Sequence, residues 1–142
     1  ASGGPEAIDA ICGDLAAAAG LPGAYRAWIA ARDSASGPVS PLARVSLVHD
    51  YWDATLSTRL FPAGTFEAPL APIAVTETGA RVPEGDEVWV GALPRPFCAD
   101  YTSADEGVLS LGTAGLVARA GWQDGSGLRA CSQAFRLYCF ER

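Results

Sequence analysis

The sequence predicts an α+β domain in which one or two helices pack against small, mostly antiparallel β-sheets. One N-terminal stretch repeats its apolar residues at helical spacing, and several short stretches alternate apolar and polar residues. Glycine and proline separate these stretches throughout the chain. The 142 residues can enclose one hydrophobic core, and no change of composition marks a boundary, so we expect residues 1–142 to form a single domain.

The first element is a helix expected from about Pro5 to Ala19. Proline at the first turn starts a helix well, whereas Gly20 is a good C-cap and Pro22 prevents continuation. The apolar residues recur at i, i+3, i+4 and i+7 and predict one buried face; they are Ile8, Ile11, Cys12 and Leu15. A cysteine that points inward from this helix is expected to tie it to a distant strand.

The following segments predict short elements separated by turns. Residues 24–31 alternate as a strand does, although their alanine content leaves a helix possible. Residues 32–41 predict a loop, and residues 45–48 a short strand. Residues 50–60 place apolar side chains near helical spacing and predict a short helix or a turn, and residues 62–72 are expected to be irregular.

The second half of the chain predicts further strands. Residues 73–82 form a plausible hairpin around Glu77-Thr78-Gly79, residues 87–91 a core strand, and residues 108–116 a short strand. Residues 122–127 predict a turn-rich approach to the last segment. In residues 131–142 bulky side chains fall on both faces of an extended strand, which predicts a central strand covered on both sides.

Composition excludes several classes of partner. The net charge is −6 and the pI about 4.6, so the surface repels phosphate, and we expect neither nucleic acid nor an anionic membrane as partner. No apolar run approaches the roughly 20 residues that span a bilayer, so membrane insertion is not expected. The chain has no Lys and no Asn, and all ten basic residues are Arg, which suggests a GC-rich bacterial genome. The lack of Met suggests a processed product or an excised domain.

The four cysteines point to disulfides rather than to a metal site. An even number allows three pairings. They form no Cys-x-x-Cys pair, and only His49 could complete a mixed zinc site, so we expect two disulfides and no metal or other cofactor. Disulfides indicate an oxidising compartment, and we therefore expect a secreted or cell-surface location.

Several short motifs occur in an order that resembles the C-type-lectin-like fold. Trp89-Val90-Gly91 is similar to that family's core Trp-Ile-Gly strand, Trp122-Gln123-Asp124 to its Trp-Asn-Asp element, and Cys131 to Cys139 to its closing cysteine spacing. Gly20 to Trp28 resembles a stretch of endostatin, and Arg136 to Glu141 resembles the ending of bacterial endostatin-like surface domains. Together these matches cover nearly the whole chain and imply a compact domain of this kind.

The resemblance implies two nested disulfides, Cys12 with Cys139 and Cys98 with Cys131. It does not carry over the family's calcium site, because only six residues separate Gly91 from Cys98 and leave no room for the long calcium-binding loop. Nor does it carry over the zinc site or the heparin patch of endostatin, because the chain has no N-terminal histidines and a negative net charge.

We expect the chain to be a bacterial recognition or adhesion module that binds an extracellular glycan or protein without calcium. Glycine-rich loops on a rigid scaffold often carry binding, which favours residues 102–127 as the binding region. The residues expected to contact the ligand are Tyr101, Asp105, Glu106, Gln123 and Asp124. The aromatic residues expected in the core are Trp28, Trp89 and Trp122, and those expected on the surface are Tyr51, Trp52 and Tyr101.

Two other classes are alternatives. The domain could be a structural tip or oligomerisation cap of a fibrous surface protein, with a homotrimer as the implied assembly. A hydrolytic enzyme is the second alternative, but we expect no enzyme. His49 with Asp50 and Asp53 is a frequent coincidence, and a thiol nucleophile, Cys12 or Cys98 with His49, competes with the disulfides.

Overall fold

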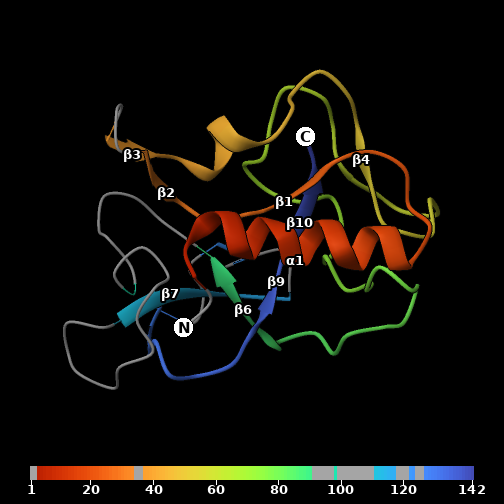
Figure 1. Cartoon of the computed structure of the whole chain (residues 1–142). Helices are drawn as coiled ribbons and strands as arrows, with labels where there is room; N and C mark the ends of the chain where they lie inside the picture. Colours follow the sequence, from red (N-terminus) through yellow and green to blue (C-terminus); the bar gives the residue numbers. More distant parts are fainter. Residues whose placement is uncertain (1–2, 34–36, 91–97, 99–110, 118–121, 124–126) are drawn as a thin grey trace.

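The computed structural model describes residues 3–33, 37–90, 98, 111–117, 122–123 and 127–142. In this part of the chain the protein is an α+β domain with one α-helix, one short 3-10 helix (η1) and small β-sheets, as predicted (Figure 1). The elements are α1 (Pro5–Ala18), β1 (Tyr25–Ala27), β2 (Ala31–Asp33), β3 (Gly37–Val39), η1 (Pro41–Arg44), β4 (Tyr51–Trp52), β5 (Arg59–Phe61), β6 (Glu87–Val90), β7 (Leu111–Leu116), β8 (Gly127–Ala130), β9 (Arg136–Leu137) and β10 (Cys139–Glu141).

The largest sheet has four strands in the order β8-β7-β6-β9. Its pairings are antiparallel except for β6 with β9, which is parallel. Three two-stranded antiparallel sheets accompany it: β1 with β10, β2 with β3, and β4 with β5. In Figure 1, α1 lies across β1 and β10, so the first element of the chain covers the last.

Helix α1 confirms the clearest local prediction and corrects part of it. The helix runs from Pro5 to Ala18, and Ile8 and Cys12 are buried against Ala27 and Ile29 as the periodicity requires. Ile11 and Leu15, which were expected on the same buried face, are both 42% exposed. The residue buried one turn beyond Cys12 is Ala16, so the buried stripe follows i, i+4, i+8 and leaves an apolar flank on the surface.

Both predicted disulfides are present. Cys12 on α1 is bonded to Cys139 on β10, across 127 positions of the sequence, with Cα atoms 5.6 Å apart. Cys98 is bonded to Cys131 across 33 positions. The second disulfide lies within the sequence span of the first, and no free cysteine remains. The disulfide between Cys12 and Cys139 covalently joins the first helix to the last strand.

The main core is a cluster of aromatic rings. Trp28 stacks on Phe66 with ring centroids 4.7 Å apart, and Phe61 meets Phe66 at 4.5 Å. Phe140 from β10 meets Trp28 and Tyr51 edge to face, both at 5.6 Å. Such offset and edge-to-face pairs add about 0.5–1.5 kcal/mol each beyond the area that they bury. The C-terminal strand therefore contributes a central ring to the core.

A buried ion pair ties α1 to β1 and to η1. The guanidinium of Arg44, which is 7% exposed, donates to Asp9 Oδ2 at 2.6 Å and to the carbonyl oxygen of Ile29 at 2.9 Å. Asp9 Oδ1 accepts the backbone N–H of Ala27 at 3.0 Å. The carboxylate of Asp9 on α1 thus accepts hydrogen bonds both from the adjacent strand β1 and from Arg44 of η1.

The prediction of one central strand over residues 131–142 is wrong. The segment divides at Tyr138 into β9, which is the edge of the four-stranded sheet, and β10, which pairs with β1. At the division the carbonyl oxygen of Tyr138 accepts the backbone N–H of Trp28 at 2.8 Å, and the Tyr138 side chain is buried. Bulky residues lie on both faces because the segment serves two sheets in succession.

Of the other segment predictions, some are confirmed and some are wrong. Residues 32–41, predicted to be a loop, contain the β2–β3 hairpin and the start of η1, and residues 45–48 form no strand. Residues 50–60, predicted to be a helix or a turn, hold the hairpin of β4 and β5. The predicted hairpin within 73–82 is confirmed as a single antiparallel bridge between Val75 and Arg81.

Candidate binding groove

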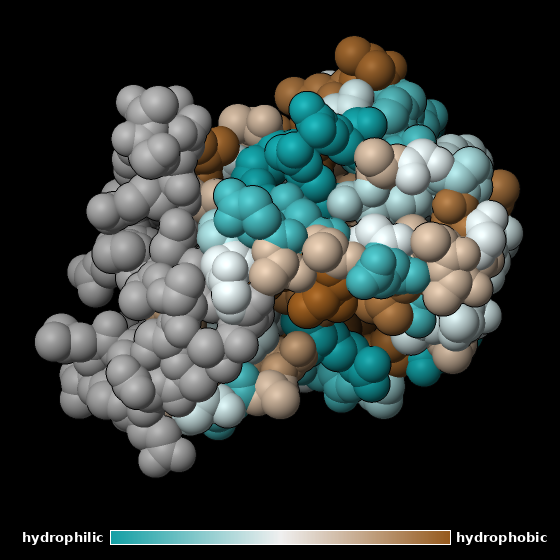
Figure 2. Space-filling model, viewed as in Figure 1, coloured by the Kyte–Doolittle hydropathy of each residue, from teal (hydrophilic) through white to brown (hydrophobic). Residues whose placement is uncertain are grey.

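A mostly apolar groove runs between α1, the segment around β4 and the segment before β6. Its volume is about 710 Å³, which lies within the usual range of ligand sites. Figure 2 shows a hollow with apolar residues around it near the middle of one face. The exposed or half-buried apolar residues that line the groove include Ile11, Leu15, Leu21, Trp52, Leu56, Ile73, Val75, Phe135 and Leu137. The polar residues that line it are His49, Asp50, Asp53, Thr76, Glu77, Arg136 and Glu141.

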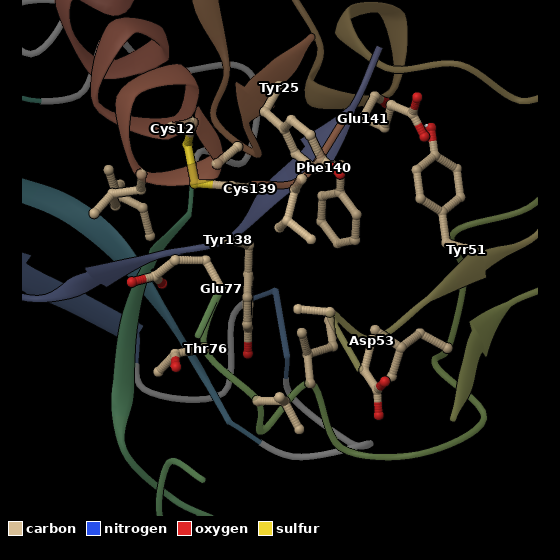
Figure 3. A pocket seen from close by; sticks show the side chains of 18 of the residues that line it. Cys12, Tyr25, Tyr51, Asp53, Thr76, Glu77, Tyr138, Cys139, Phe140 and Glu141 are labelled. Atoms are coloured by element: carbon tan, nitrogen blue, oxygen red, sulfur yellow. Dashed lines mark hydrogen bonds between the residues drawn. A yellow bond between two sulfur atoms is a disulfide. The ribbon is translucent and has the colours of Figure 1, made fainter. Parts of the chain in front are cut away.

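The deeper part of the groove is built from β10 and the residues beside it. Figure 3 shows Tyr138, Phe140 and the disulfide of Cys12 with Cys139 around the cavity, with Tyr51 on one side. The hydroxyl of Tyr51 donates to a backbone carbonyl oxygen, and the carbonyls of Ser46 and Glu141 both lie 2.8 Å away. These rings and the disulfide come from elements far apart in sequence, so the groove forms only when β10 has packed against α1 and β1.

The tyrosines of the groove stay neutral over the physiological pH range. Burial raises the pKa of Tyr138 well above its ordinary value. Burial and the charge of Glu141 raise the pKa of Tyr25. In Tyr51 the same two causes outweigh the hydrogen bond to Ser46, and the pKa again lies above its usual value. A neutral phenol offers a ligand an aromatic face and a hydroxyl without a negative charge.

His49 lies at the edge of the groove beside Glu141. The imidazole Nε2 is shielded from solvent and makes no hydrogen bond within the described part of the chain. Its distance to Glu141 Oε2 is 4.0 Å, which is too long for a hydrogen bond. The ring meets that of Tyr51 at 4.8 Å. The grouping of His49 with Asp50 and Asp53, which we treated as a coincidence of the sequence, does not form, because Asp50 pairs with Arg59 at 3.1 Å and Asp53 bonds its own loop.

The loop between β4 and β5 holds an exposed leucine at the mouth of the groove. Asp53 is buried, and its Oδ1 accepts the backbone N–H groups of Thr55 and Ser57, both at 3.1 Å, and the hydroxyl of Thr55 at 2.7 Å. Leu56 at the tip has φ 56°, in the left-handed region that leucine rarely adopts, and its side chain is 76% exposed. The polar bonds of Asp53 therefore maintain an unfavourable backbone conformation that presents an apolar side chain.

The Asp53 loop yields a pH prediction. Burial raises the pKa of Asp53, but hydrogen bonds from Thr55, Thr58 and Ser57 outweigh burial and hold it below its usual value. A lowered pKa means that the carboxylate stabilises the fold at neutral pH and loses this effect as pH falls through the native pKa, below about 4. We expect Asp53→Asn to reduce the free energy of unfolding by about 1–3 kcal/mol at pH 7 and by less at pH 3.

Urea unfolding at the two pH values measures this difference. Asp14→Asn, which changes an exposed acid on α1, is the control and should show no comparable dependence on pH. An equal loss at pH 7 and pH 3 for Asp53→Asn would show that the charge of Asp53 does not hold the loop.

Of the predicted ligand-contacting residues, the structure describes one. The side-chain amide of Gln123 donates to the carbonyl oxygen of Phe66 at 3.2 Å, and the indole N–H of Trp122 donates to that of Glu67 at 3.3 Å. These two bonds fasten the segment 122–123 to the segment 66–67. The other four predicted residues lie outside the described residues: Tyr101, Asp105, Glu106 and Asp124. Their role stays a prediction.

The predictions of which aromatic residues are buried are confirmed in part. Trp28 and Trp122 are buried as expected, and Trp52 is 47% exposed as expected. Tyr51 was expected on the surface but is buried, because its hydroxyl finds backbone acceptors inside the fold. Trp89, expected in the core, is only partly buried, and its indole N–H donates to the carbonyl of Gln133. Tyr101 lies outside the described residues.

Sequence reasoning did not find the groove. Its apolar wall on α1 was assigned to the core, and two of its acids, Glu77 and Glu141, were not considered for binding. A signal was present: α1 has apolar residues on more than one stripe, whereas the domain buries only one. Among the residues that the structure describes, no group of three or more histidines, cysteines or acids could hold a metal ion.

Comparison of the chain with protein-family models, curated proteins and solved structures gave no match. The likeness to the C-type-lectin-like fold therefore stays an expectation from sequence motifs. In the described part of the chain, no helix has the length and apolar character to cross a membrane.

Proposed function

We propose that this domain is a secreted or surface-displayed recognition module that binds an extracellular ligand, a glycan or a protein, in the groove and without calcium. The observation that carries the proposal is the apolar lining of the groove, where Leu15, Trp52 and Leu56 are each more than 40% exposed. Exposed apolar side chains around a concave site are typical of binding surfaces. The two disulfides favour an oxidising environment outside the cytoplasm, where such a ligand would be met.

The site has the rigidity that recognition requires. One wall belongs to α1, which a disulfide and the Asp9–Arg44 pair hold in place. The other includes Leu56, which the bonds of Asp53 fix in one conformation. A wall that is ordered before binding loses little conformational entropy when the ligand arrives.

The test is a screen of the oxidised domain on a glycan array and against a displayed library of random peptides, each run with calcium and with chelator. We expect ligands in the presence of chelator, and we expect Leu15→Gln to weaken their binding about 10-fold, since one buried leucine contributes roughly 1.5–3 kcal/mol. Leu42→Gln is a matched control, because Leu42 lies outside the groove and is 43% exposed, close to the 42% of Leu15.

Two outcomes would contradict the proposal. No ligand in either screen would favour the alternative of a structural tip or assembly cap, for which concentration-dependent mass of the domain is the measurement. Ligands whose binding is equal in the Leu15→Gln and Leu42→Gln variants would place the binding surface away from the groove.

A further inference from the structure

The charges around the groove indicate the chemical class of its ligand, an inference that rests on the proposed function. The acids that line the groove are Asp50, Asp53, Glu77 and Glu141, and the one arginine among the lining residues is Arg136. The guanidinium of Arg136 lies 3.5 Å from Asp86, so its charge is already balanced. The groove is therefore negative as well as apolar.

Two of the four acids are available to a ligand. Asp50 pairs with Arg59, and Asp53 accepts the hydrogen bonds of its own loop. Glu77 forms no ion pair within the described residues, and Glu141 has only the imidazole of His49 at 4.0 Å. In the view of Figure 3 Glu77 and Glu141 lie on opposite sides of Cys139 and Phe140, and both acids line the groove.

The apolar wall favours aliphatic and aromatic side chains over sugars. Ile11 and Leu15 are four residues apart on α1, one above the other on the same face, and Leu56 projects from its fixed loop. The exposed ring of Trp52 can face a sugar as well as an aromatic side chain, but the branched aliphatic groups that also line the groove cannot stack on a sugar ring, and they pack well against leucine or valine side chains of a peptide. A volume of about 710 Å³ accommodates several such side chains.

We propose that the groove binds a segment of a partner protein that carries apolar side chains and at least one lysine or arginine. The apolar side chains would pack on Ile11, Leu15 and Leu56, and the cation would pair with Glu77 or Glu141. A second copy of this chain is disfavoured, because two molecules of net charge −6 repel each other. Membrane surfaces and nucleic acids are disfavoured for the same reason, since both are anionic.

The test uses a displayed library of random 12-residue peptides, selected on the oxidised domain. We expect the selected peptides to be rich in apolar residues and in Lys or Arg, and poor in Asp and Glu. Synthetic copies then give dissociation constants by fluorescence polarisation. Replacing the selected Lys or Arg by Gln should weaken binding about 3- to 10-fold, and so should the double variant Glu77→Gln with Glu141→Gln. Raising the salt concentration should weaken binding of the unaltered pair and have little effect on the variants.

Glu84→Gln is the matched control, because Glu84 is an exposed acid outside the groove, and its binding should be unchanged. Near-UV circular dichroism of each variant confirms that it is folded. The proposal is overturned if selected peptides show no preference for basic residues, or if the double variant binds as tightly as the unaltered domain.

The results also separate this inference from the proposed function. Peptides without charge preference that Leu15→Gln still weakens would keep the groove as the binding site and reject the cationic ligand. Glycan ligands that Leu15→Gln weakens, found without any peptide ligand, would also keep the groove as the binding site and reject the cationic peptide. Self-association that Leu15→Gln abolishes would identify a second copy as the occupant. Absence of any ligand and of self-association would reject both.

Discussion

Replacing Cys12 and Cys139 together by alanine is expected to lower the free energy of unfolding by about 5 kcal/mol. The disulfide closes a loop of 127 positions, and in the chain-entropy model a loop of this length restricts the unfolded chain by roughly that amount. Domains of this size are stable by only about 5–15 kcal/mol, so the variant should be partly unfolded at moderate temperature. Guanidinium unfolding at equilibrium, followed by tryptophan fluorescence, measures the loss.

The second disulfide supplies the comparison. Cys98 and Cys131 close a loop of 33 positions, for which the same model gives about 4 kcal/mol, so this double replacement should cost less. Because Cys12 is also buried in the contact of α1 with β1, we expect the first variant to lose binding in the groove as well. A smaller loss for the Cys12 and Cys139 variant than for the Cys98 and Cys131 variant would contradict the chain-entropy account.

Arg44→Met is expected to reduce the free energy of unfolding by about 3 kcal/mol. Methionine keeps the apolar stem but removes the guanidinium, which leaves the carboxylate of Asp9 and the carbonyl of Ile29 without their donor. Breaking a buried pair typically costs about 3–5 kcal/mol because the remaining charge is uncompensated. We expect the lower limit, since Arg26 lies 3.8 Å from the same carboxylate and Asp9 is partly exposed to water. Urea unfolding at pH 7 gives the value.

Arg59→Met is the matched control for this prediction. Arg59 also donates to a carboxylate, that of Asp50 at 3.1 Å, but both side chains are about 40% exposed. An exposed pair contributes about 0–1 kcal/mol, so the two methionine variants should differ clearly. Equal losses in the two variants would mean that burial of Arg44 does not strengthen its interaction.

The elements that the sequence predicts correctly are those whose structure is determined by neighbouring residues. Helix α1 follows from a proline at its start, from Gly20 at its end and from the periodicity between them. Strand β6 follows from four consecutive residues that alternate in burial. The remaining strands have two to six residues; β2 with β3 and β4 with β5 are local hairpins, but β1 pairs with β10 and β9 with β6 through contacts distant in the sequence. Tyr138 is the clearest case, because its backbone leaves the sheet of β6 to accept a hydrogen bond from Trp28, which no local pattern reveals.

The candidate site was harder to predict for a physical reason. Apolar residues on a helix indicate that they contact other apolar groups, but not whether those groups belong to the same chain. Ile11 and Leu15 fit the core pattern yet line an open groove. Tyr51 fits the surface pattern yet lies inside, because Ser46 and Glu141 supply acceptors for its hydroxyl. For Tyr51 the acceptor on Glu141 is remote in the sequence, and for Ile11 and Leu15 the partner that we propose belongs to another molecule.

The contact between α1 and β10 has a consequence for synthesis. Ribosomes make the helix about 120 residues before the strand to which it is bonded, and the strand β1 must also await β10 as its partner. Until residues 139–141 emerge, the apolar side chains of the helix have no lasting cover, and such surfaces attract chaperones and other chains. Nascent chains that stop shortly before Cys139 should therefore be sensitive to protease within α1 and β1, and chains that include β10 resistant there. Closure of this domain thus reports that synthesis has passed residue 141.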